Sequence, residues 1–123
     1  DAEIELVDFE FAVEGEISSG EQLLHVFNTG TELHELIAFR LREGFTMEDV
    51  QAALEQEMAG EQMAEEDLPM DFDYGTQLSP GVEMYVTHDF EPGTYVFICF
   101  IPSPENNMTP HYELGMIDEV IVE

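Results

Sequence analysis

The segment from Thr94 to Ile101, TYVFICFI, limits most strongly how this chain can fold. Its residues are almost all apolar, β-branched or aromatic, and apolar and polar positions do not alternate. A run of this kind is typical of a β-strand that is buried on both faces. It is far shorter than the ~20 apolar residues that cross a membrane as a helix. The chain must therefore supply a covering layer on each side of this strand.

A helix is predicted for residues 47–58, and it can cover one side of that strand. Thr46 and Asp49 resemble a capping box, in which each side chain bonds the backbone N–H of the other residue. Four apolar residues follow at helical spacing, and the opposite face is acidic: Met47, Val50, Leu54 and Met58. Residues 59–79 combine acids with glycine and proline, so we expect them to be irregular. We interpret 43–79 as an insertion within a single domain that spans residues 1–123.

The other segments have the short apolar runs and turn residues of an all-β domain. The alternation changes phase between Leu6 and Val7, which predicts a bulge or kink in a first strand. The runs 23–28 and 33–41 flank a turn-prone Asn-Thr-Gly sequence and are predicted to be neighbouring strands. Together with 117–122, which closes the chain, these runs predict an all-β Greek-key sandwich of seven or eight strands with one inserted α-helix.

The charge of the chain is extreme and is spread along its whole length. There are 29 Asp and Glu residues against two Arg and no Lys, so the formal net charge is −27. This balance excludes binding to nucleic-acid phosphates, or to anionic membranes through basic patches. Self-repulsion of this size destabilises a compact chain, and salt relieves it. We interpret the acidity as the solvated surface of a protein from a salt-loving source; a strongly cationic partner or ligand is the alternative.

The only cysteine, Cys99, lies near the end of the apolar segment, and His111 and Met116 follow it before the last predicted strand. Two histidines, a cysteine and a weak axial methionine suit copper in an electron-transfer site. A second histidine would have to come from elsewhere in the chain. The alternative for Cys99 is an inert small side chain in a core strand. Three further methionines lack a regular spacing and are interpreted as packing residues rather than Cu(I) ligands: Met58, Met63 and Met70.

Two stretches look like the halves of one signature: 26–34, VFNTGTELH, and 92–99, PGTYVFIC. They resemble the plastocyanin/azurin-like blue copper proteins, the cupredoxins. The resemblance extends over residues 20–42 and 80–123, and it implies a cupredoxin-like sandwich. It also implies export to the periplasm or cell surface, with or without a membrane anchor in the full-length protein.

The resemblance further implies one type 1 copper ion held by His34, Cys99 and His111, with Met116 as the axial ligand. His25 and His88 lie outside the matching motifs, and we interpret both as structural.

The chain departs from the family's usual pattern at two points. Eleven residues separate Cys99 from His111, a longer loop than is usual, and we expect its one strong tether to be the copper–imidazole bond. Glu35 follows His34 where plastocyanins usually carry Asn. The hydrogen bond that usually supports the cysteine sulfur in that family is therefore not assured by the residue at this position.

Electron transfer is the function that the resemblance implies. We expect a monomer that meets a redox partner protein, which would be cationic if charge guides docking. The sequence contains no catalytic-triad pattern, phosphate-binding loop or HExxH helix, so we do not expect an enzyme. Two alternatives are a metal-free cupredoxin-like interaction module and a copper carrier.

Overall fold

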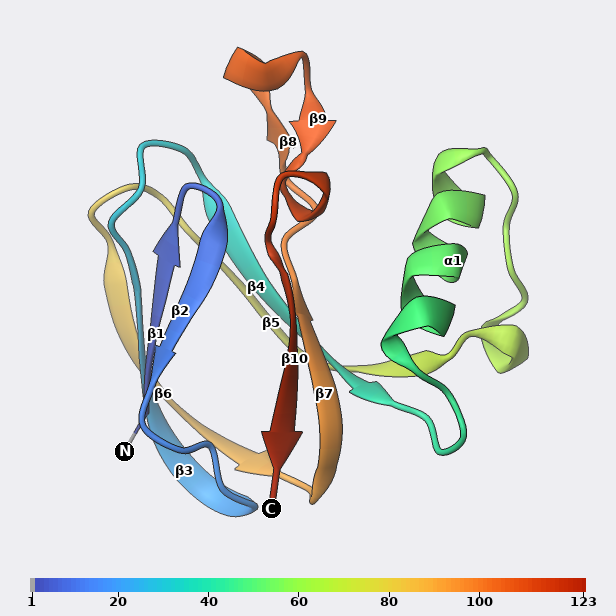
Figure 1. The fold of residues 1–123 in the computed structure, drawn as a ribbon. Helices are drawn as coiled ribbons and strands as arrows, with labels where there is room; N and C mark the ends of the chain where they lie inside the picture. Colours follow the sequence, from blue (N-terminus) through green and yellow to red (C-terminus); the bar gives the residue numbers. More distant parts are fainter. Residues whose placement is uncertain (1) are drawn as a thin grey trace.

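The computed structural model describes residues 2–123, which form two four-stranded β-sheets packed as a sandwich (Figure 1). The first sheet, in the order β2-β1-β3-β6, contains β1 (Ala2–Val7), β2 (Glu10–Glu14), β3 (Gly20–Asn28) and β6 (Glu83–Phe90). The second sheet, in the order β10-β7-β4-β5, contains β4 (His34–Leu41), β5 (Met70–Leu78), β7 (Gly93–Ile98) and β10 (Ile117–Val122). A separate short ladder contains β8 (Pro102–Ser103) and β9 (Thr109–Pro110). The predicted sandwich is confirmed.

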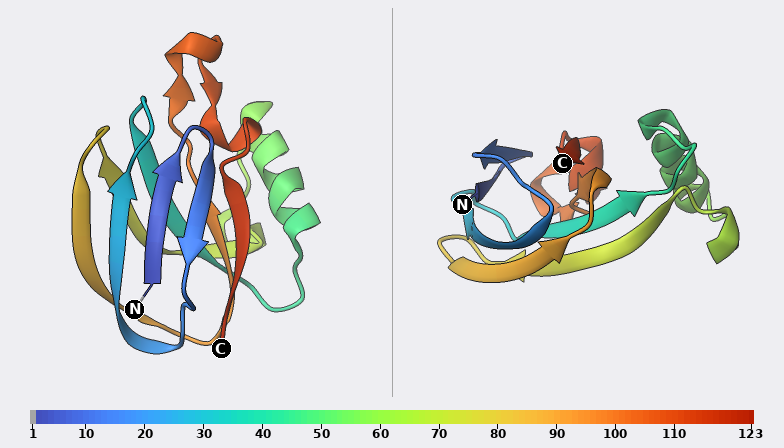
Figure 2. Two further views of the ribbon diagram at one scale, coloured as in Figure 1. Left: turned by 60° about the vertical axis from the view of Figure 1, so that its left-hand side comes forward. Right: turned by 90° about the horizontal axis from the view of Figure 1, so that it is seen from below.

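The helix α1 (Met47–Met58) lies beside the second sheet, away from the first (Figure 2). Its capping box is present: Thr46 N–H donates to Asp49 Oδ2 at 2.8 Å, and Asp49 N–H donates to the Thr46 hydroxyl at 3.4 Å. Val50 and Leu54 pack in one cluster with Val96 and Ile98 of β7.

The other side chains of β7, Tyr95 and Phe97, pack between the two sheets. Because neighbouring side chains of a strand point to opposite faces, β7 is buried on both sides. The predicted burial on both faces is confirmed, but the strand ends at Ile98 and does not extend to Ile101, so Cys99 follows it. The helix predicted at 47–58 is also confirmed.

The expectation that residues 59–79 are irregular is wrong for the second half of the segment. Only a short 3₁₀ turn at Glu65–Asp67 lies between α1 and β5, and β5 pairs antiparallel with β4. β5 is an edge strand, and acidic residues such as Asp71 and Asp73 occupy its exposed or partly exposed positions. Its sequence therefore lacks the apolar run from which a strand could be predicted. Gly75 is a site of close packing, because an added Cβ would lie 2.9 Å from Ile37 Cδ1.

Two other predictions about neighbouring strands are also wrong. β3 and β4 do not pair, because the connection between them crosses from the first sheet to the second. The Asn28 amide stabilises this crossing by donating to the backbone oxygens of Glu32 and Leu78. The change of phase after Leu6 is a turn at residues 8–9, and β1 and β2 form an antiparallel hairpin in place of one bulged strand.

Three connections meet at one end of the sandwich, seen at the top of Figure 1. They are the β1–β2 turn, the β3–β4 crossing and the β8–β9 hairpin, which projects beyond the sheets (Figure 1). The candidate metal-binding residues lie at this end of the sandwich. Among residues 2–123, none of the helices has the length and apolar character required to cross a membrane.

Candidate metal centre

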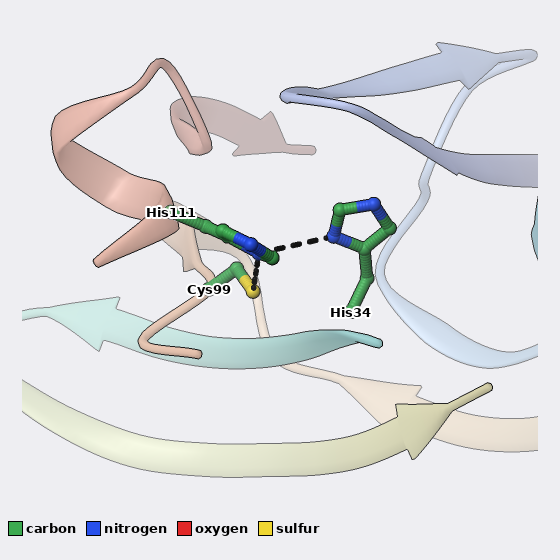
Figure 3. A group of neighbouring side chains, drawn as sticks. All are labelled: His34, Cys99 and His111. Carbon is green, nitrogen blue, oxygen red and sulfur yellow. Dashed lines mark hydrogen bonds between the residues drawn. The ribbon is translucent and has the colours of Figure 1, made fainter. Parts of the chain in front are cut away.

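Three buried side chains bring their donor atoms together at this end of the sandwich. They are His34, the first residue of β4; Cys99, directly after β7; and His111, the first residue of a 3₁₀ turn (His111–Glu113) (Figure 3). Their ligand atoms lie within 4.8 Å of one another, and each residue is 0% exposed. The structure thus brings together the three residues that the sequence grouped, and their role as metal ligands stays a prediction.

The two imidazoles face each other through their Nδ1 atoms, which are 3.1 Å apart. Cys99 Sγ lies 3.3 Å from His111 Nδ1. The opposite ring nitrogens contact carboxylates: His34 Nε2 lies 2.6 Å from Asp8 Oδ1, and His111 Nε2 lies 2.9 Å from Glu32 Oε1. A carboxylate accepts, so each neutral imidazole places its hydrogen on Nε2 and its lone pair on Nδ1.

Two Nδ1 lone pairs at this distance repel each other unless a proton or a metal ion lies between them. Burial lowers the pKa of His34, the nearby His111 lowers it further, and only the contact with Asp8 and the charge of Glu32 oppose this. An extra proton on the His34 ring is therefore disfavoured. Two imidazole nitrogens and one sulfur, all directed inward, fit a borderline or soft metal ion such as copper.

The comparisons with known proteins concern the fold. No protein-family model matches the chain, and no curated protein matches it in sequence. Solved structures do match over almost its whole length. An auracyanin from the photosynthetic bacterium Roseiflexus castenholzii is 20% identical with a TM-score of 0.58, and the match covers 98% of this chain and 94% of that one. The chain has a cupredoxin-like fold.

Two further structures agree with this assignment. Auracyanin A from Chloroflexus aurantiacus, described as a "blue" copper protein, is 22% identical with a TM-score of 0.53, over 98% of this chain and 96% of that one. The azurin Az-iso2 of Methylomonas sp. strain J is 12% identical with a TM-score of 0.55, over 98% and 95%.

Within this cupredoxin-like fold, Glu35 connects the first histidine strand to the cysteine segment. Its backbone N–H donates to Cys99 Sγ at 3.3 Å, and its Oε1 accepts from the Phe100 N–H at 3.0 Å. The support of the sulfur therefore comes from the backbone, which does not depend on Asn at this position. Gln77 Nε2 donates to the second carboxylate oxygen at 3.2 Å.

Met116 is fully buried, and its backbone is hydrogen-bonded to two of the three donor residues. Its N–H donates to the carbonyl of His111 at 3.0 Å, and its own carbonyl accepts from Cys99 N–H at 3.1 Å. Its side chain belongs to the same core cluster as Cys99. Its role as the axial ligand stays a prediction.

The long loop between Cys99 and His111 is more firmly held than the sequence suggested. Its extra residues form the β8–β9 hairpin around a 3₁₀ turn (Pro104–Asn106), and Met108 N–H donates to Ser103 O at 2.7 Å. His111 is fixed by its N–H, which donates to Ile101 O at 2.8 Å, and by Glu32 at Nε2. The expectation that a copper–imidazole bond is the only strong tether is wrong.

Sequence reasoning missed three residues that surround the donors: Asp8, Phe9 and Glu32. The Phe9 ring lies against His111, with centroids 4.9 Å apart, and edge-on to His34 at 6.2 Å. Glu32 lies inside the VFNTGTELH stretch, but nothing in that stretch separates its carboxylate from the many other acidic side chains of the chain. Asp8 and Phe9 lie in a hairpin turn with no such motif.

The remaining histidines and methionines lie outside the site. His25 contacts Glu3 and Glu83, and His88 contacts Asp73 at 2.8 Å. Met70 packs under α1 as predicted, whereas Met58 is 56% exposed and does not fill the core.

The metal-free protein should lose stability between about pH 9 and pH 11 because of Cys99. Burial raises the pKa of this thiol to about 11, although the N–H of Glu35 favours the thiolate. Above pH 9 the unfolded chain releases the thiol proton while the folded protein retains it, so the free energy of unfolding falls by up to about 1.4 kcal/mol per pH unit.

Chemical denaturation across this range should show a steeper loss in the wild type than in Cys99→Ala. Burial also raises the pKa values of three tyrosines, which add the same trend above pH 10 in both proteins: Tyr74, Tyr95 and Tyr112. Equal slopes in the two proteins would contradict the raised pKa of the thiol.

Proposed function

We propose that this protein carries single electrons through one type 1 copper ion held by His34 Nδ1, His111 Nδ1 and Cys99 Sγ, with Met116 as the weak axial ligand. The observation that carries the proposal is the convergence of the two Nδ1 atoms and the sulfur of three fully buried residues. The cupredoxin-like fold supports it, because the auracyanin A that it resembles is described as a "blue" copper protein.

When bound, copper would supply the reversible one-electron couple. The protein's own residues hold that site in one arrangement. His34 begins β4 and Cys99 directly follows β7, and these two strands pair in the second sheet. The N–H of Glu35 donates to the sulfur, and the Phe9 ring lies against the His111 imidazole. Ligands held in one arrangement move little between the two oxidation states, which keeps the reorganisation energy of electron transfer low. No substrate bond is made or broken, so the protein is an electron carrier and not an enzyme.

Copper uptake with an intense visible absorption band tests the proposal. Titration of Cu(II) into the metal-free protein should produce a thiolate-to-copper charge-transfer band, because binding deprotonates Cys99. Cys99→Ala should abolish the band. His25→Ala, which removes an imidazole outside the site, should retain it.

The outcomes separate this function from its alternatives. No copper uptake by the wild type would favour a metal-free interaction module, and uptake without the band would exclude type 1 copper. A copper carrier would release the ion to a chelator within minutes. The complete burial of all three donors disfavours such release, since ligand exchange requires an incoming ligand to reach the metal.

We further propose a cationic redox partner, a salt-rich environment and a location outside the cytoplasm. The charge of −27 supports the first two, because positive charge on this chain is confined to two arginines. Arg42 is occupied by Asp71 and by the carbonyls of Glu65, Glu66 and Leu68. The location rests on the sequence resemblance alone.

A further inference from the structure

Two carboxylates from separate connections approach the outer nitrogens of the two imidazoles. Asp8 lies in the β1–β2 turn and its side chain is 23% exposed, and Glu32 lies in the β3–β4 crossing and its side chain is 11% exposed. Asp8 Oδ1 lies 2.6 Å from His34 Nε2, and Glu32 Oε1 lies 2.9 Å from His111 Nε2. Both imidazole rings are fully buried. Each ring of the proposed copper site is thus in direct contact with an acidic residue.

Both carboxylates are themselves fixed by donors from neighbouring segments. Asp8 Oδ2 accepts from the Thr31 N–H at 3.0 Å and from the Thr31 hydroxyl at 2.6 Å. Glu32 Oε2 accepts from the Ser103 hydroxyl at 2.9 Å, which links it to the β8–β9 hairpin. An added Cβ at Gly30 would collide with both Asp8 and His34 Nε2, so the close approach on that side requires glycine.

We infer that Asp8 and Glu32 are positioning residues that orient both imidazoles toward the metal and lower the reduction potential of the site. The inference rests on the proposed copper function. A carboxylate that accepts the Nε2–H fixes the tautomer with the lone pair on Nδ1 and makes the ring a stronger donor. Two negative charges so close to a buried ion also stabilise Cu(II) more than Cu(I), because the electrostatic interaction scales with the ion's charge.

The effect of each carboxylate can be measured with neutral, isosteric substitutions. Glu32→Gln and Asp8→Asn keep an oxygen that can accept from Nε2–H but remove the negative charge. Each should lower the preference for Cu(II) over Cu(I) about tenfold, which raises the one-electron potential by about 59 mV. Glu105→Gln is the matched control, since it removes an exposed carboxylate from the β8–β9 hairpin at the same end of the sandwich and should leave the potential nearly unchanged.

A second measurement does not need copper or a variant. Nitrogen-15 NMR of the metal-free wild type should show the hydrogen of both His34 and His111 on Nε2. A hydrogen on Nδ1 of either ring would overturn the inference for that residue. The same spectra remain informative if Asp8→Asn fails to fold.

Failure of the inference and failure of the proposed function give different results. A wild type without the charge-transfer band would reject the type 1 site, whereas the tautomers would still decide the positioning role. A wild type with the band, whose potential is unchanged in both carboxylate variants or moves equally in Glu105→Gln, would overturn the inference and leave the copper function intact.

Discussion

Cu(II) should raise the melting temperature of the metal-free protein by about 15 °C when free copper is about a thousandfold above its dissociation constant. A ligand that binds only the folded state stabilises it by about 4.1 kcal/mol under this condition. For a domain of this size each kcal/mol corresponds to about 4 °C. The three donors come from β4, the end of β7 and the turn after β9, and exist together only in the folded chain.

Differential scanning calorimetry with two controls separates the site from the acidic surface. Cys99→Ala should lose most of the copper-dependent gain, and His88→Gln, which removes an imidazole outside the site, should retain it. Mg²⁺ at the same concentration, in 1 M NaCl, should have little effect, because a hard ion binds carboxylates and avoids sulfur. Equal stabilisation by Mg²⁺, or of Cys99→Ala by copper, would assign the effect to surface carboxylates.

The elements that the sequence predicted are those whose signals are local and strong. The apolar run at 94–101 required burial on both faces, and β7 is covered by the first sheet and by α1. The capping box at Thr46 set the start of the helix, and its bonds are present. In both cases the residues that determine the element lie within the element itself.

The errors concern features that depend on tertiary pairing. β5 is specified by its register with β4 and not by its own composition, since an acidic edge strand resembles a loop in sequence. The Asn-Thr-Gly turn could join paired strands or cross between sheets with the same residues. The phase change after Leu6 fits a bulge and a tight hairpin equally well, because both invert the side-chain pattern.

The donors of the site were predictable, whereas their carboxylate partners were not. Cys99 is the only thiol of the chain, and a histidine follows it before the last predicted strand. These two features made both residues recognisable as candidate ligands. Asp8 and Glu32 are two among 29 acidic residues, and their chemistry does not distinguish them from the rest. Only the packing of the β1–β2 turn and the β3–β4 crossing against the histidines identifies them.

The melting temperature of the metal-free protein should rise by about 10 °C between 0.1 and 1 M NaCl. Two like charges about 10 Å apart in water repel each other by about 0.4 kcal/mol, of which roughly a third remains at 0.1 M salt and almost none at 1 M. With about three such neighbours for each excess carboxylate, roughly 40 pairs change by about 5 kcal/mol in total. The unfolded chain shares part of this repulsion, which leaves about half as the net gain.

The helix α1 offers a direct test that charge is the cause. Glu55 and Glu57 are exposed near its C-terminus, where the helix dipole disfavours negative charge, and no basic residue occupies the last turn. Glu55→Gln/Glu57→Gln should therefore be more stable than the wild type at 0.1 M NaCl, and the difference should shrink at 1 M as screening removes the repulsion. A melting temperature that is independent of salt in the wild type, or a double variant with no advantage at low salt, would show that self-repulsion does not limit the stability of this fold.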